Sequence, residues 1–207
     1  MGAGAVSPPP RQDHGPGASG ASATTLSMRS LVAVAIGEAG EASRGPHGLA
    51  HWARVLENGM RLAAMTEASS RVVMAFAVLH DVRRRTRPRG IGRDPGHGAR
   101  AAEFAASLPH DVLPLDHAEM ALLVEAIAGH EAGRVAADTT IGTCWDADRL
   151  DAEPGSAAAR WPACTGAGAD PDIRAWAARR RAESHVPAET IAEWGIDPTA
   201  VAIDGWR

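Results

Sequence analysis

The stretch AFAVLHDVRRR, residues 75–85, decides the fold. It closes an almost unbroken apolar run from Val72 to Leu79, and that run stops at the adjacent pair His80 and Asp81. A segment that is apolar on nearly all sides is typical of a buried central helix. A buried imidazole beside a buried carboxylate is costly without a positive partner. The stretch therefore predicts a central helix whose C-terminal end presents His80 and Asp81 to a divalent metal ion.

The composition indicates one soluble domain. The 207 residues are 45% hydrophobic, and the net charge of −4 gives no basic footprint for nucleic acid. All 21 basic residues are arginine and tyrosine is absent, which excludes lysine Schiff-base chemistry, a P-loop lysine and a catalytic phenol. Two cysteines are too few for a disulfide scaffold. Neither a signal-peptide pattern nor a membrane-spanning run is present, so we expect a cytoplasmic protein that binds neither membrane nor nucleic acid.

Helical periodicity dominates after an N-terminal segment of Gly, Ala, Ser and Pro, residues 1–25, which we expect to be a disordered tail. No stretch alternates with period 2 for long enough to predict a strand. We therefore predict an all-α bundle of about six or seven helices, forming a single domain over residues 28–207 with a C-terminal helical extension at 153–207. Helices are expected at 29–42, 47–65 and 69–82, after N-caps at Asp94 and Asp116, from Thr139 or Thr140, and, beyond a loop at 152–171, near 172–184 and 187–194.

Two histidines outside the central helix point inward by helical phase. His97 shares a face with Phe104, and His130 shares one with Ile127. A lone histidine on an apolar face is more often a core residue than a ligand, but independent burial of several imidazoles would be costly. Together with His80 and Asp81, these histidines favour a metal site. Imidazole and carboxylate ligands suit Mn, Fe, Ni, Co or Zn.

The helix expected at 47–65 carries a polar stripe opposite its apolar face, formed by His47, His51, Arg54 and Asn58. One interpretation is a solvated face of an amphipathic helix. The alternative is a stripe that is itself partly covered, because apolar residues such as Val55 are interleaved with it.

These residues resemble the HD superfamily of metal-dependent phosphohydrolases, whose pattern is an early His, an adjacent His-Asp pair and a late Asp. The segment HGLAHWARV resembles the first motif and places a metal ligand at His51. VLHD supplies His80 and Asp81, and DADRLDA resembles the last motif, which places a ligand at Asp148. The resemblance covers residues 47–152 and implies the helical fold of that superfamily.

The doubled DAD makes the register of the last motif ambiguous, because Asp146 competes with Asp148. Helical phase favours Asp148, which shares a face with Ile141 and Trp145. We therefore predict Asp148 as the ligand and keep Asp146 as the alternative.

His97 and His130 follow the order in which two-metal members, such as the HD-GYP phosphodiesterases, insert two extra histidines. The GYP signature is missing, which argues against a cyclic-dinucleotide esterase. The resemblance thus implies one or two divalent ions, with Asp81 bridging a pair. The alternative is one ion, with both histidines hydrogen-bonding phosphate or packing. The six implied ligands are His51, His80, Asp81, His97, His130 and Asp148.

The activity that the resemblance implies is hydrolysis of a phosphomonoester or phosphodiester by a metal-activated water, on a small phosphorylated substrate such as a nucleotide. We predict Asp81 and His47 as catalytic, although His47 is equally compatible with a surface histidine. Arg54, Arg83 and Arg84 are the candidates for binding phosphate oxygens. The run RRRTRPR, residues 83–89, is also typical of a solvated basic loop.

Two other functions fit the same ligand order. Some HD proteins hold a mixed-valent di-iron centre and are oxygenases that cleave C–C or C–P bonds. A metal-binding or ligand-sensing module without turnover is the non-catalytic alternative.

Overall fold

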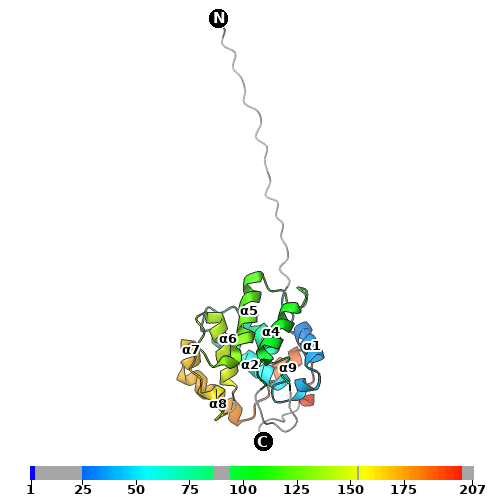
Figure 1. The fold of residues 1–207 in the computed structure, drawn as a ribbon, viewed down its shortest axis with the longest axis vertical. Helices are drawn as coiled ribbons and strands as arrows, with labels where there is room; N and C mark the ends of the chain where they lie inside the picture. Colours follow the sequence, from blue (N-terminus) through cyan, green and yellow to red (C-terminus); the bar gives the residue numbers. More distant parts are fainter. Residues whose placement is uncertain (3–24, 86–93, 153, 202–207) are drawn as a thin grey trace.

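The computed structural model describes residues 1–2, 25–85, 94–152 and 154–201 (Figure 1), so the predicted tail at 1–25 lies almost entirely outside the described residues. Within these ranges the structure is helical and has no strand, which confirms the all-α prediction. The α-helices are α1 (Met28–Ala39), α2 (Leu49–Ala63), α3 (Ser70–Leu79), α4 (His97–Ser107), α5 (His117–Gly129), α6 (Thr139–Leu150), α7 (Gly166–Ala169), α8 (Pro171–Ala182) and α9 (Ala188–Glu193). Short 3-10 turns lie at Gly40–Arg44, His130–Ala132, Ala158–Arg160 and Pro198–Ala200.

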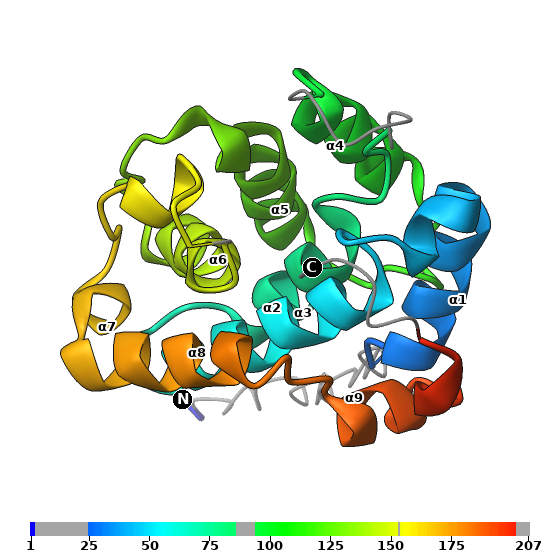
Figure 2. The ribbon, with the colours of Figure 1, turned by 90° about the horizontal axis from the view of Figure 1, so that it is seen from below.

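Helix α3 is the centre of the bundle. It begins after Ser69, whose side chain accepts a hydrogen bond from the backbone N–H of Val72, and every residue from 75 to 79 is buried. It packs against α1, α2, α5 and α6, and Figure 2 shows it enclosed by them. Burying apolar side chains on all sides of one helix fixes that helix firmly. The residues just after it, His80 and Asp81, are therefore held inside the protein.

A glycine sets the close approach of α4 and α5. A Cβ on Gly98 would lie 2.7 Å from the backbone oxygen of Ile127, so only glycine lets α4 pack this closely. The neighbouring residue, His97, begins α4, and His130 follows the last residue of α5. The contact between the two helices thus brings their histidines together.

The helix starts agree with the sequence at two sites and differ at a third. Asp116 forms a capping box with Glu119, and Asp138 caps α6. The expectation that Asp94 caps a helix is wrong, because α4 begins at His97 after Gly96 in the left-handed conformation, φ 79°. The Asp94 carboxylate instead accepts hydrogen bonds from the Arg85 backbone and from Arg100.

The segment after Asp151 packs back onto α6. The single turn α7 forms inside the region that we expected to be a loop, because the Thr165 hydroxyl accepts a hydrogen bond from the Gly168 backbone. Helices α7 and α8 both contact α6, and α9 contacts α2. No described helix has the length and apolar character needed to cross a membrane.

Candidate metal centre

Five elements bring the predicted ligands to one place. His51 lies in α2, His80 and Asp81 follow α3, and His97 begins α4. His130 follows α5, and Asp148 lies in α6. Five of these six side chains are buried, namely His51, His80, Asp81, His97 and His130. The Asp148 side chain is 19% exposed, since it borders a cavity.

Each of the four buried histidines uses Nδ1 to donate a hydrogen bond. His80 donates to the backbone oxygen of Phe76 at 3.1 Å, and His130 donates to that of Ile127 at 2.7 Å. The other two have equivalent partners, which are the Asp94 backbone oxygen at 2.8 Å for His97 and the Asp151 carboxylate at 2.7 Å for His51. Because a carbonyl or carboxylate oxygen can only accept, Nδ1 carries the hydrogen in every case. The Nε2 atom of each neutral imidazole therefore holds a lone pair.

These Nε2 atoms point at one another. The Nε2 atoms of His51 and His80 are 3.1 Å apart, and those of His97 and His130 are 2.9 Å apart. Asp148 Oδ1 lies 3.5 Å from His51 Nε2 and 3.6 Å from His80 Nε2. Lone pairs and carboxylate oxygens at such distances repel one another unless a cation lies among them. The donor set therefore fits a metal ion.

Asp81 lies between the two pairs of histidines. Its Oδ2 atom is 3.8 Å from His51 Nε2 and 3.7 Å from His80 Nε2, whereas its Oδ1 atom is 2.8 Å from His97 Nε2 and 3.6 Å from His130 Nε2. His51, His80 and Asp148 form one group that could hold a metal ion, and Asp81, His97 and His130 form another. Within each group the candidate ligand atoms all lie within 4.8 Å of one another.

The pKa values of the clustered side chains also indicate that positive charge is favoured among them. Burial alone would lower the pKa of His51, but hydrogen bonds and charge from Asp148 and Asp151 raise that pKa to about 9. Burial lowers the pKa of His80 to about 4, in spite of the Asp81 and Asp148 carboxylates. Burial alone would raise the pKa of Asp81, but the surrounding imidazoles hold it well below its ordinary value. Without a metal ion, protons on some imidazoles supply the cation that the carboxylates require.

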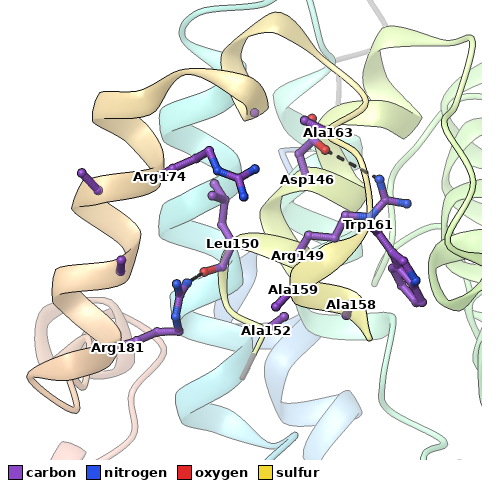
Figure 3. Close-up of a pocket in the computed structure, with 13 residues that line it drawn as sticks. Asp146, Arg149, Leu150, Ala152, Ala158, Ala159, Trp161, Ala163, Arg174 and Arg181 are labelled. Atoms are coloured by element: carbon purple, nitrogen blue, oxygen red, sulfur yellow. Dashed lines mark hydrogen bonds and ion pairs between the residues drawn. The ribbon is translucent and has the colours of Figure 1, made fainter. Parts of the chain in front are cut away.

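The two aspartates of the DAD sequence face opposite sides of α6. Asp148 faces the histidines, whereas Asp146 turns away and accepts hydrogen bonds from the backbone of Cys164 and Thr165 and from the Thr165 hydroxyl, each at 2.8 Å. Figure 3 shows Asp146 on this second side, near Arg149. The structure thus brings Asp148, and not Asp146, to the candidate site.

Two carboxylates that our sequence analysis did not select support the histidines from outside. Asp151 accepts hydrogen bonds from His51 Nδ1 at 2.7 Å and from Arg54 Nε at 2.8 Å. Glu131 Oε2 lies 3.2 Å from His97 Nδ1. Carboxylates in this position fix the tautomer and orientation of a metal-binding histidine. The spacing of Asp151, three residues after Asp148 and hence on nearly the same helical face, was the available signal.

The candidate site opens into a cavity of about 330 Å³. His47 stands at its edge with Nδ1 3.0 Å from Asp81 Oδ2, and 44% of the His47 side chain is exposed. Arg84 also lines the cavity, and its Nη1 atom lies 3.3 Å from Asp81 Oδ1. Glu131, Asp151, Ser156 and Trp161 also line this cavity.

The structure does not bring the other two predicted phosphate ligands to this cavity. Arg54 is buried and held by Asp151, so it braces the support of His51 and does not line the cavity. Arg83 points away from the site, because its Nε donates to Glu38 and its guanidinium lies over the Phe104 ring. Of the three predicted arginines, only Arg84 lies where a bound substrate could meet it.

Comparisons of this chain with protein-family models, with curated proteins and with solved structures found no match.

Proposed function

We propose that the protein is a metal-dependent phosphohydrolase that acts on small phosphorylated substrates. The observation that carries this proposal is the convergence of four imidazole Nε2 atoms and two carboxylates at the floor of an open cavity. A purely structural cluster would have no need of six acceptors facing one another, since removing polar groups from water without partners is costly. The resemblance to the HD superfamily in the order of the motifs points to the same chemistry.

The side chains around the cavity would have different roles, which are binding the metal ions and binding the substrate phosphate. His51, His80 and Asp148 would hold one divalent ion, and Asp81, His97 and His130 would hold a second. Divalent ions bound in this way lower the pKa of a water molecule and neutralise phosphate oxygens. Arg84, at the cavity wall, would orient the phosphate through its planar guanidinium.

His47 would serve the proton transfer. Its Nδ1 atom faces the Asp81 carboxylate, and its ring is partly exposed at the mouth of the cavity. A histidine in that position can deliver a proton to the oxygen that leaves the phosphorus. The nearby Asp81 therefore has two roles in the proposal, which are binding metal ions and orienting His47.

A screen for phosphatase activity tests the proposal. Aerobically purified protein would be loaded with Mn, Fe, Ni, Co or Zn in turn and assayed against nucleotides and a generic aryl phosphate. We expect metal-dependent release of phosphate, which Asp148→Asn abolishes and the matched variant Asp146→Asn retains. Arg84→Gln should raise KM more than it lowers kcat, because it removes a contact with the substrate phosphate.

Two results would contradict the hydrolase. Iron at about two ions per chain with a mixed-valent spectroscopic signal, and no phosphatase activity with any metal, would support the di-iron oxygenase. Tight metal binding without turnover of any phosphate ester would support the non-catalytic module.

A further inference from the structure

A second cavity lies on the other side of α6. It has a volume of about 340 Å³ and is bordered by α6, α8 and the segment after Asp151. Three arginines line it, namely Arg149 from α6 and Arg174 and Arg181 from α8 (Figure 3). We call it the arginine pocket. The candidate metal ligands do not line it.

The arginines of this pocket are unequally engaged. Arg149 is committed to the fold, since its terminal nitrogens donate to the backbone oxygens of Pro162 and Arg134. Arg181 donates one terminal nitrogen to the backbone oxygen of Leu150, and its Nε has no hydrogen-bond partner among the described residues. The Arg174 side chain has no hydrogen bond or ion pair within the described part of the chain, and Figure 3 shows its guanidinium directed toward Leu150 and the space between the helices.

Charge in the pocket is unbalanced. Asp146 is the one carboxylate among its described lining residues, and it is already satisfied by three donors from Cys164 and Thr165. Three guanidinium groups and one carboxylate leave a formal charge of +2. Burial lowers the pKa of Arg181; the Asp151 carboxylate opposes this effect, and the positive charge of Arg174 adds to it. Two like charges that share one cavity wall gain stability from an anion placed between them.

The charge and the lining of the pocket indicate which class of anion it would bind. Guanidinium groups bind phosphate and carboxylate oxygens through paired hydrogen bonds. A phosphate group carries about −1.5 to −2 at pH 7, which matches the +2 of the pocket, whereas one carboxylate would leave half of it unbalanced. The rest of the wall consists largely of small apolar side chains, among them Ala158, Ala175 and Ala178. Such a wall suits the carbon portion of a small molecule.

We infer that the arginine pocket is a second ligand site, which binds a small molecule through a dianionic phosphate group held by Arg174 and Arg181. Ala152, Ala158 and Trp161 line both this pocket and the cavity of the candidate metal centre. A molecule bound here therefore touches the segment that forms a wall of the metal cavity. The inference does not depend on the hydrolase proposal, because none of the candidate metal ligands takes part in it.

Calorimetric titration of the full chain with inorganic phosphate, and with acetate as a singly charged comparison, tests this site. We expect saturable phosphate binding that Arg174→Gln weakens about tenfold, as the loss of one charge-assisted hydrogen bond would do. Arg179→Gln is the matched control, because Arg179 is exposed on the same helix and does not line the pocket. It should bind phosphate as the wild type does. Acetate should bind much more weakly than phosphate.

A variant with the metal centre disabled, Asp81→Asn, separates the two sites. It should keep the phosphate binding that Arg174→Gln weakens. Arg174 is exposed and its side chain has no hydrogen-bond or ion-pair partner in the described fold, so its substitution should leave the melting temperature unchanged. Wild-type phosphate affinity in Arg174→Gln, loss of phosphate binding in Asp81→Asn, or equal affinity for acetate and phosphate would each overturn the inference.

Discussion

The two sides of α6 carry aspartates only two residues apart, and they do opposite things. On one side, Asp148 faces imidazole nitrogens that hold lone pairs, and its side chain borders the cavity. On the other side, Asp146 is almost fully buried and faces three donors, two backbone N–H groups and a hydroxyl. The Asp146 carboxylate therefore has a full set of hydrogen-bond donors, whereas the Asp148 carboxylate is surrounded by other acceptors.

This difference teaches how to separate a candidate ligand from a buried polar residue. A structural carboxylate is surrounded by groups that can donate, so it needs nothing further. A ligand carboxylate is surrounded by other acceptors, so it needs a cation. Burial alone does not distinguish the two, since Asp81 is buried as deeply as Asp146 and belongs with the acceptors.

The largest contrast should come from the paired variants Asp148→Asn and Asp146→Asn. Asp148→Asn should lose about one of the two ions, because it removes a charged ligand from the group with His51 and His80. Asp146→Asn should keep the wild-type metal content but lower the free energy of unfolding by about 1–3 kcal/mol, since buried donors lose a charged acceptor. Elemental analysis and chemical denaturation measure the two effects. Equal metal loss in both variants would remove the distinction between the two sides.

Removal of the metal ions should destabilise the protein through the ligands on the Asp148 side of α6 and not through Asp146. A ligand that binds the folded state alone stabilises it by about 4 kcal/mol when present at a thousand times its Kd. We therefore expect a chelator to lower the melting temperature of the wild type and of Asp146→Asn. The chelator should lower the melting temperature of Asp148→Asn by less than that of the wild type, because only the ion held by Asp81, His97 and His130 remains to be removed. A wild-type melting temperature that does not respond to the chelator would be evidence against a bound ion.

A smaller effect should come from the carboxylates behind the histidines. Asp151→Asn should weaken metal affinity by about 10- to 100-fold, because it removes the charged acceptor that holds His51 Nδ1. Glu131→Gln should have a weaker effect, since His97 Nδ1 keeps the Asp94 backbone oxygen as acceptor. Metal titration of both variants measures the order. A larger loss in Glu131→Gln than in Asp151→Asn would show that the hydrogen bonds to Nδ1 do not govern the site.

Much of this arrangement could be predicted from local pattern. The apolar run before His80 identified the central helix, and helical phase placed His97, His130 and Asp148 on inward faces. These features depend on periodicity within one helix, which the sequence displays directly.

Features that depend on contacts between distant segments could not be predicted in this way. The partner of Arg54 is Asp151, 97 residues away, and that of Arg83 is Glu38, 45 residues away, so neither arginine could be removed from the phosphate-binding set before the fold was known. The start of α4 was missed because Asp94 has Arg85 and Arg100 as partners, which outweigh its local preference to cap a helix. The single turn α7 within the predicted loop could not be foreseen for the same reason, because Asp146 accepts hydrogen bonds from the backbone of Cys164 and Thr165.

The central claim is that His51, His80, Asp81, His97, His130 and Asp148 form a centre for two metal ions. Metal content per chain, measured on purified wild type and on His80→Ala, His97→Ala and His130→Ala, tests it most directly. The account predicts close to two ions in the wild type and about one fewer in each of His80→Ala, His97→Ala and His130→Ala, because each histidine belongs to one of the two ligand groups. Full wild-type metal content in His97→Ala or His130→Ala would contradict the two-ion centre, and a wild type without bound metal under any loading would contradict the metal centre itself.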